Sequence, residues 1–243
     1  MEILTGSGCD NVELLHNEFI KGKPVPSILI PNFLKTETAL ELYNESQHDD
    51  SAWKVFTRNG SYMKEYNNIE LLPTAYKFYS YIHSKPFLDW LQQLTGIKGL
   101  IPDPHLVGAG YSKSFNGDIL KVHTDFNWND TLRLYRAVSL IVYLTPDWKE
   151  EWGGGLSFFD DNREEVISTL PCLFNNCAIW KYDERAFHGY TRPITCPDDK
   201  SRNSIRAFYY TSQIENVDTF KPHRSLYWFD ENTKQPFDKR EEI

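Results

Sequence analysis

Three side chains in the second half of the chain have the types and spacing of a metal site. His123 and Asp125 are two positions apart, and His188 follows in the sequence Phe-His-Gly. Side chains at i and i+2 of an extended backbone point to the same side, so one imidazole and one carboxylate would lie together. Two histidines and one carboxylate on one face of a metal leave positions open, which suits Fe(II) and O2. The pattern therefore predicts an Fe(II) centre held by His123, Asp125 and His188.

The His-x-Asp triplet alone is a weak signal, because a histidine beside an acidic residue is often simply exposed or satisfied by a neighbour. The order of the surrounding segments strengthens the interpretation. An apolar run follows Asp125, a glycine turn at 153–155 follows that run, and His188 then precedes a strand that contains arginines. The metal prediction depends on this order rather than on the triplet.

Two arginines after His188 are candidates for binding an acidic cosubstrate. Arg202 and Arg206 are four positions apart on a predicted strand and share one of its faces. A buried carboxylate, such as the distal one of 2-oxoglutarate, needs a charged partner, and arginine can bind it through two parallel hydrogen bonds. Either arginine could serve. The alternative is that both are solvent-exposed charges at the rim of the fold.

The elements that must position these residues divide the chain. The first 35 residues are interpreted as irregular or strand-like, with a short apolar run at 27–30. Thr36 is the expected N-cap of a first helix. A second helix is expected to begin near Pro73, and a third spans 84–95 with Gly96 as its stop.

After residue 100, short β-type runs alternate with turn signals, which favours an antiparallel sandwich or barrel. We expect a mostly β fold with a helical support layer, namely a double-stranded β-helix of the jelly-roll, cupin-like type. The whole chain, 1–243, is treated as one domain, with helical support at 1–100, the β core at 101–215 and a wrapping C-terminal segment at 216–243. The expected strands are 119–123, 137–145, 156–159, 166–170, 177–182 and 204–211.

Composition excludes several classes of partner. The formal net charge of −8 and the absence of a basic run argue against nucleic acid. No window approaches the roughly 18 apolar residues of a membrane span, and the N-terminus does not have the form of a signal peptide. Four cysteines without a C-x-x-C pair predict reduced, buried thiols in a cytoplasmic protein.

Four blocks of sequence, in order, resemble the prolyl 4-hydroxylase-like branch of the 2-oxoglutarate/Fe(II) oxygenases over roughly residues 105–212. The resemblance implies that Arg202 binds the distal carboxylate of 2-oxoglutarate, with Arg206 as the fallback. It implies that Tyr143 helps to hold the same carboxylate and that Tyr111 faces the cosubstrate; Tyr143 may instead simply pack in the barrel. The gap of fourteen residues from His188 to Arg202 is longer than in many relatives. The blocks are His-Thr-Asp-Phe-Asn-Trp from 123, Leu-Ile-Val-Tyr-Leu-Thr-Pro-Asp-Trp from 140, Trp-Gly-Gly-Gly-Leu-Ser-Phe-Phe-Asp from 152, and His-Gly at 188 continued by Ser-Arg-Asn-Ser-Ile from 201 and Phe-Tyr-Tyr-Thr from 208.

The same resemblance implies a dioxygenase that uses Fe(II), O2 and 2-oxoglutarate, with ascorbate as an optional addition. Its substrate would be a prolyl residue in a peptide or protein, and a free amino acid or another small molecule is the alternative. Readings from other classes are a non-catalytic cupin-like binding module and a metal-dependent hydrolase. A nucleic-acid demethylase is disfavoured by charge, and the oligomeric state is left open. Four aromatic residues could form a substrate wall or pack within loops: Phe126, Trp128, Trp148 and Trp152.

Overall fold

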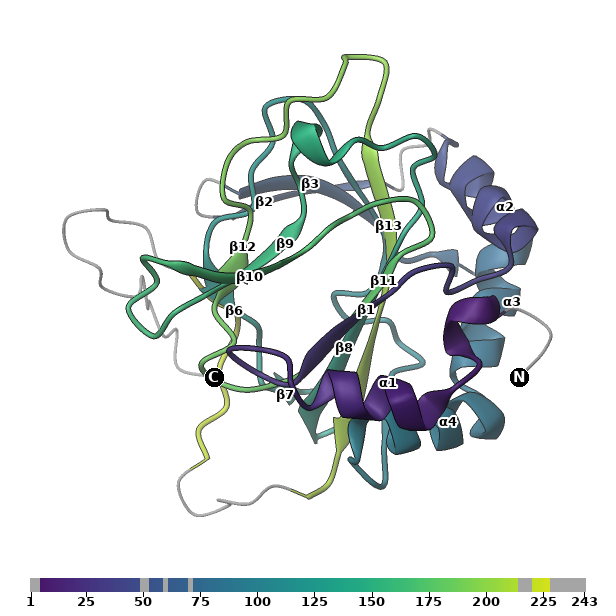
Figure 1. Ribbon diagram of the computed structural model, residues 1–243, viewed down its shortest axis with the longest axis vertical. Helices are drawn as coiled ribbons and strands as arrows, with labels where there is room; N and C mark the ends of the chain where they lie inside the picture. Colours follow the sequence, from purple (N-terminus) through teal and green to yellow (C-terminus); the bar gives the residue numbers. More distant parts are fainter. Residues whose placement is uncertain (1–4, 49–52, 59–60, 70–71, 214–219, 228–243) are drawn as a thin grey trace.

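Two antiparallel β-sheets form the centre of the molecule in the computed structural model, which describes residues 5–48, 53–58, 61–69, 72–213 and 220–227. Within these residues, the larger sheet has nine strands and the smaller sheet has five. Figure 1 shows the larger sheet between the helices and the smaller sheet. The larger sheet runs in the order β1 (Ser27–Ile30), β11 (Cys177–Lys181), β8 (Leu134–Tyr143), β13 (Arg202–Thr211), β5 (Gly110–Ser114), β3 (Ser61–Tyr66) and β2 (Lys54–Arg58), with β4 (Ile101–Pro102) beside β13 and β7 (Trp128–Asn129) beside β8.

The smaller sheet carries two of the predicted metal ligands. Its strands run in the order β10 (Val166–Leu170), β9 (Leu156–Phe159), β12 (His188–Gly189), β6 (His123–Thr124) and β14 (Leu226–Tyr227). His188 lies directly opposite His123 in the antiparallel register. Two imidazoles that are 65 residues apart in sequence are therefore neighbours in space, since opposed residues of paired strands point to the same face.

The central strands of the larger sheet have two different faces, because successive side chains point to opposite sides. Ser204 pairs with Tyr143, and Arg206 pairs with Ile141, so this set of side chains faces the smaller sheet. The residues between them, such as Leu140 and Ile205, face the other way and join the main hydrophobic core.

Of the part of the chain that the structure describes, four α-helices cover that other face, as Figure 1 shows. Tyr79 and Tyr209 tie the helical layer to the sheet: the Tyr79 hydroxyl donates to the Arg206 carbonyl at 2.5 Å, and the Tyr209 hydroxyl donates to the Ile82 carbonyl at 3.2 Å. Phe87 packs edge-on against Phe33 at 6.3 Å between ring centroids. The helices are α1 (Val12–Phe19), α2 (Thr36–Ser46), α3 (Pro73–Ile82) and α4 (Lys85–Thr95), with short 3-10 turns at Ser7–Cys9 and Glu150–Trp152.

The expected jelly-roll class, with helices supporting a mostly β core, is confirmed. Helix α3 begins at Pro73, where proline needs no hydrogen-bond partner for its nitrogen. Helix α4 ends as expected at Gly96, whose φ of 73° is the left-handed conformation that glycine adopts without strain. Helix α2 includes Thr36 as its first residue, and Lys35 takes the cap position instead.

Several sequence predictions were wrong. The first 35 residues contain α1, which the apolar spacing of Val12, Leu15 and Phe19 and the Asn11 cap on the Leu14 amide stabilise. Strands β2, β3 and β5 were not predicted. The expected strand at 119–123 shrinks to β6, because the backbone before it is bonded elsewhere: the Lys121 amide donates to Ser61 Oγ, and the Leu120 carbonyl accepts from the Tyr190 amide.

All four cysteines are free and buried, as predicted. Of the predicted C-terminal wrapping segment, only 220–227 lies within the described residues, and the division of 1–243 into three parts stays a prediction. Across the described part of the chain, no helix is both long enough and apolar enough to span a bilayer.

Candidate metal centre

His123, Asp125 and His188 converge as their spacing predicts. One ligand atom from each lies within 4.8 Å of the other two. His123 Nε2 is 3.6 Å from Asp125 Oδ1, and His188 Nε2 is 3.8 Å from Asp125 Oδ2. Both histidines are buried, with 5% and 3% of their surface exposed. Two nitrogens and one carboxylate on one side of a common point form the donor set that Fe(II) oxygenases use.

The backbone orients both imidazoles in the same way. His123 Nδ1 lies 2.9 Å from the Lys121 carbonyl, and His188 Nδ1 lies 2.7 Å from the Ala186 carbonyl, each two residues upstream. A carbonyl can only accept, so each Nδ1 must carry the proton and donate it. The lone pair of each Nε2 then points toward Asp125 and is available to a metal.

The charges in the site hold the ligands in their metal-binding protonation states. Burial alone would raise the pKa of the Asp125 carboxyl, but the Arg136 guanidinium, together with the neighbouring histidines, outweighs it and holds that pKa far below its ordinary value. Burial, aided by neighbouring His123, lowers the pKa of His188 to about 4. The carboxylate is therefore ionised and His188 is neutral at neutral pH.

Arg136 is a site residue that sequence reasoning missed. Its Nη2 donates to Asp125 Oδ2 at 2.8 Å and to Ser139 Oγ at 2.9 Å. Its guanidinium lies between the Phe126 ring at 4.5 Å and the Phe208 ring at 3.6 Å. The signal available in the sequence was a single arginine inside an otherwise apolar strand, where a charge requires a buried partner.

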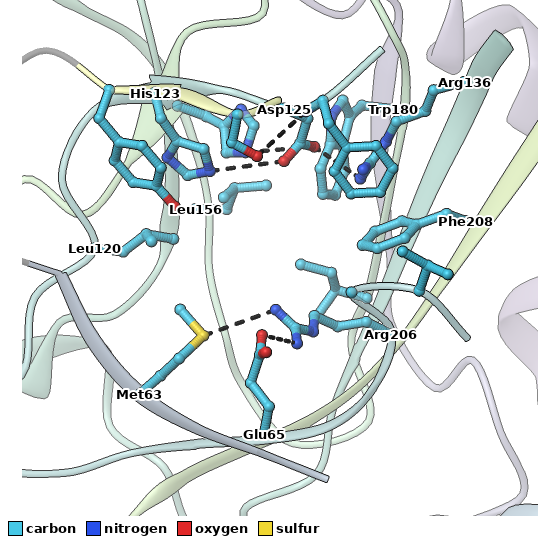
Figure 2. Close-up of a pocket in the computed structure, with 17 residues that line it drawn as sticks. Met63, Glu65, Leu120, His123, Asp125, Arg136, Leu156, Trp180, Arg206 and Phe208 are labelled. Atoms are coloured by element: carbon cyan, nitrogen blue, oxygen red, sulfur yellow. Dashed lines mark hydrogen bonds and ion pairs between the residues drawn. The ribbon is translucent and has the colours of Figure 1, made fainter. Parts of the chain in front are cut away.

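A cavity of about 230 Å³ opens beside the triad, which is smaller than the roughly 300 Å³ at which pockets for drug-sized ligands begin. Figure 2 shows His123, Asp125 and Arg136 on one side of it, and Arg206, Glu65 and Met63 on the opposite side. Trp180, Leu156 and Ile141 line the part that leads toward the core between the sheets. The cavity is therefore mostly apolar, with charged groups at its two ends.

Arg202 and Tyr143 do not line this cavity, and they lie further toward the core between the sheets than Ile141 does. Tyr143 follows Ile141 by two residues on the same face of β8, about 7 Å further along the strand. The Arg202 guanidinium packs against the Tyr143 ring at 4.8 Å and against the Tyr190 ring at 4.9 Å, and its Nε donates to the Gly154 carbonyl at 2.7 Å. Arg202 is 4% exposed, so the two residues lie together at the buried end of the space between the sheets.

The glycine turn makes room for this arginine. Gly154 has φ of 76°, and a β-carbon placed on it would lie only 2.7 Å from Arg202 Cδ. A side chain at this position would both strain the backbone and displace the arginine. The turn at 153–155 that the sequence singled out is thus the support of Arg202.

Arg206 and Tyr111 occupy other places. Arg206 lines the cavity, but its Nη2 pairs with Glu65 Oε1 at 2.5 Å, so a carboxylate of the protein already occupies it. Tyr111 pairs with Ile205 and points into the helical layer, where its hydroxyl donates to Glu45 at 3.3 Å. The expectation that Tyr111 faces the cosubstrate was therefore wrong. Successive residues of a strand point to opposite faces, and it is the neighbouring Ser112 that points toward the smaller sheet.

The residues present fit both groups that the site implies. The triad offers two imidazole nitrogens and one ionised carboxylate, a set suited to Fe(II). Among the residues described, Arg202 has no carboxylate partner, and the buried Tyr143 hydroxyl has no hydrogen-bond partner. A guanidinium that has no carboxylate partner, beside a hydroxyl that has no hydrogen-bond partner, suits the distal carboxylate of 2-oxoglutarate.

The aromatic wall suggested by the sequence is only partly present. Phe126 lines the cavity. Trp128 packs instead against Tyr135 at 5.0 Å, and Trp148 packs against Trp152 at 5.2 Å. Three of the four aromatic residues therefore contribute to loop packing.

Comparison with known proteins agrees with this site. Residues 109–210 match the family model described as the 2OG-Fe(II) oxygenase superfamily. A prolyl hydroxylase from Trichoplax adhaerens, solved in complex with a hypoxia inducible factor oxygen degradation domain peptide, has a TM-score of 0.58 and 18% identity, covering 82% of this chain and 90% of that one. HygX from Streptomyces hygroscopicus, solved with nickel, 2-oxoglutarate and hygromycin B, has a TM-score of 0.55 and 12% identity, covering 81% and 87%.

A mouse protein is related in sequence. Prolyl 3-hydroxylase OGFOD1 of Mus musculus is 24% identical over 138 residues, which are 55% of this chain and 23% of that protein. The chain thus corresponds to about a quarter of its curated relative. The match over residues 109–210 confirms the resemblance of this segment to the 2OG-Fe(II) oxygenases, and the similarity to prolyl hydroxylases agrees with the prolyl 4-hydroxylase-like branch.

Proposed function

We propose that this oxygenase hydroxylates a C–H bond of a prolyl residue in a peptide or protein, with Fe(II), O2 and 2-oxoglutarate. The observation that carries the proposal is the convergence of two imidazole Nε2 atoms and one carboxylate within 4.8 Å at the wall of a small cavity. The identities of the relatives, which include a prolyl 3-hydroxylase and a prolyl hydroxylase, support the choice of a prolyl substrate.

Five residues would hold the iron and the cosubstrate. His123, Asp125 and His188 would ligate Fe(II), and Arg202 with Tyr143 would bind the distal carboxylate of 2-oxoglutarate. When bound, these groups and O2 supply the oxidising chemistry that converts C–H to C–OH, with succinate and CO2 as the products of the cosubstrate.

The surrounding residues of the chain would fix and shield this chemistry. Arg136 keeps Asp125 ionised and aimed at the metal position through its 2.8 Å hydrogen bond. Trp180 packs against His188 at 5.5 Å between ring centroids and, with Leu156, excludes water from the inner part of the cavity. The site would be preorganised, because each ligand has its own support.

The outer part of the cavity suits an uncharged aliphatic group. Met63, Phe126 and Phe208 give it an apolar lining. The charged groups opposite the triad, Arg206 and Glu65, neutralise each other. This end therefore favours the ring and amide groups of a peptide-bound proline over the separate charges of a free amino acid.

The test is a turnover assay with two substrate arms. Purified protein with Fe(II) and 2-oxoglutarate, with and without ascorbate, should form succinate. A proline-containing peptide blocked at both ends should gain the mass of one oxygen atom, and free L-proline should not. His123→Ala is the control, and succinate formation that persists in this variant would refute the iron assignment.

Ascorbate stimulation and a cytoplasmic location are further parts of the proposal. Four free, buried thiols support a reducing compartment. The assay with and without ascorbate tests the stimulation, and imaging of the tagged full chain tests the cytoplasmic location.

A further inference from the structure

A C-terminal segment, residues 220–227, runs beside the segment that carries two of the metal ligands. In strand β14, Leu226 pairs with Thr124, and Tyr227 pairs with His123. Ser225 Oγ accepts from the Phe126 amide at 3.2 Å. The matched family segment ends at residue 210, so this neighbour of the ligand strand comes from outside it.

Tyr227 lies flat against the first metal ligand. Its ring centroid is 4.7 Å from that of His123, and the two planes differ by 12°. Tyr227 is 3% exposed and lines the same cavity as the triad. The imidazole is thus restrained from two directions: by the Lys121 carbonyl at Nδ1 and by the tyrosine across its face.

The ligand strand has little other support. Strand β6 contains only His123 and Thr124, and on its other side it pairs with β12 at His123 alone. A two-residue strand with one pair on one side would leave the ring face of His123 without this support, and only the bond to the Lys121 carbonyl would orient it. Strand β14 closes the second side.

The segment is fastened upstream of β14 by polar contacts. The Asn127 side chain accepts from the His223 amide at 2.8 Å and donates to the Lys221 carbonyl at 2.9 Å. His223 Nε2 lies 2.9 Å from Glu184 Oε2, and this glutamate also accepts from Asn127 Nδ2 at 3.1 Å. Asn127 therefore connects the segment to the backbone just past Asp125.

We propose that Tyr227 is a positioning residue for the metal centre: its ring, delivered by β14, holds the His123 imidazole in the orientation that binds the metal. The proposal rests on the proposed iron site and adds to it a determinant outside the oxygenase domain segment. Groups that orient a metal ligand typically affect metal affinity by about 10–100-fold when removed.

The experiment measures binding of Co(II), whose preferences are next to those of Fe(II), without turnover. Tyr227→Ala should weaken Co(II) binding at least about tenfold and speed its release to a chelator. Tyr227→Phe keeps the ring and should stay within about threefold of wild type. Leu226→Ala is the matched control, because its side chain lines a separate cavity on the opposite face of β14 and should leave Co(II) binding unchanged.

A second readout needs no metal. Amide hydrogen exchange at 123–125 in the metal-free protein should be faster in Tyr227→Ala than in Leu226→Ala. The proposal is overturned if Tyr227→Ala binds Co(II) like wild type, or if Tyr227→Phe loses as much affinity as Tyr227→Ala. If wild type and His123→Ala bind Co(II) equally, the iron site itself fails, which is a different result.

Discussion

The two faces of strands β8 and β13 differ in whether their buried polar atoms have hydrogen-bond partners. On the helix-facing side, two buried tyrosine hydroxyls are matched: the Tyr79 hydroxyl donates to the Arg206 carbonyl, and the Tyr209 hydroxyl donates to the Ile82 carbonyl. On the side facing the smaller sheet, several buried atoms have no partner among the described residues: Arg136 Nη1, Tyr143 Oη, Trp180 Nε1 and Arg206 Nε. Unmatched buried polar atoms are costly, so their grouping on one face marks the face built to receive ligands.

The difference separates residues that maintain the fold from residues that maintain the site, although both sets are equally buried. Burial alone does not distinguish Leu140 from Ile141, or Tyr209 from Tyr143. What distinguishes them is the face on which each lies and whether its polar atoms are paired. Substitutions on the two faces should therefore affect different measurements.

The largest contrast is between the buried His188 and the partly buried His83. His188→Ala should reduce succinate formation to the level of the metal-free protein, because a metal ligand is lost. His83, at the end of α3, also has a pKa lowered to about 4, mainly by burial. His83→Ala should retain turnover and Co(II) binding. Equal loss of Co(II) binding in His188→Ala and His83→Ala would show that the two faces do not differ in this way.

On the helix side, Phe87→Ala should lower the free energy of unfolding by about 3–5 kcal/mol. The ring is fully buried and packs against Phe33 and Trp90. Chemical denaturation measures the loss. The half-saturating concentration of 2-oxoglutarate should remain that of wild type below the unfolding transition, and a matching rise in it would contradict the comparison.

A pair of tyrosine-to-phenylalanine substitutions sharpens the contrast. Tyr143→Phe should weaken 2-oxoglutarate binding about tenfold, because one hydrogen bond to a charged carboxylate is lost. The free energy of unfolding of the metal-free protein should be unchanged. Tyr209→Phe should do the reverse: it loses the bond to Ile82 and about 1 kcal/mol of stability, with binding unchanged. Cosubstrate titration and denaturation of both variants provide the test, and an exchange of the two outcomes would refute it.

The smallest expected effect is on pH dependence. The pKa of His83 is about 4 in the folded protein and near its ordinary 6.5 when unfolded. The unfolded chain therefore binds a proton first as pH falls, so stability decreases from pH 6.5 toward pH 4. His83→Asn should remove part of this decrease, on the order of 1 kcal/mol by pH 5. Denaturation at pH 7 and pH 5 measures this change in stability, and an unchanged pH slope in His83→Asn would contradict the lowered pKa of His83.

Individual residues show which parts of the site could be predicted from the sequence. His123 and Asp125 were predictable because their i, i+2 relation is local, and His188 because few residue types complete such a site. Tyr111 was misplaced because sequence cannot fix which of two adjacent residues faces inward until the strand register is known.

The remaining site residues depend on contacts between distant segments. Glu65 enters the cavity from β3, a strand that no sequence pattern predicted. Arg136 is meaningful only once Asp125 is placed beside it. Tyr227 reaches His123 from more than a hundred positions away, and a polar C-terminal segment offered no periodic signal for it.

The long connection between the last metal ligand and Arg202 has a consequence for how this protein could vary. Its two ends belong to different sheets: His188 is held by β6 and β9, and Arg202 by β5 and the carbonyl of Gly154. Between these ends, Ile194 and Cys196 pack in the same core cluster as Tyr143, whereas residues 197–199 are exposed. Insertions or deletions within the exposed turn at 197–199 can therefore change the outer surface of the molecule while the spacing between the His-Asp-His triad and Arg202 stays constant, which leaves this turn open to diversification.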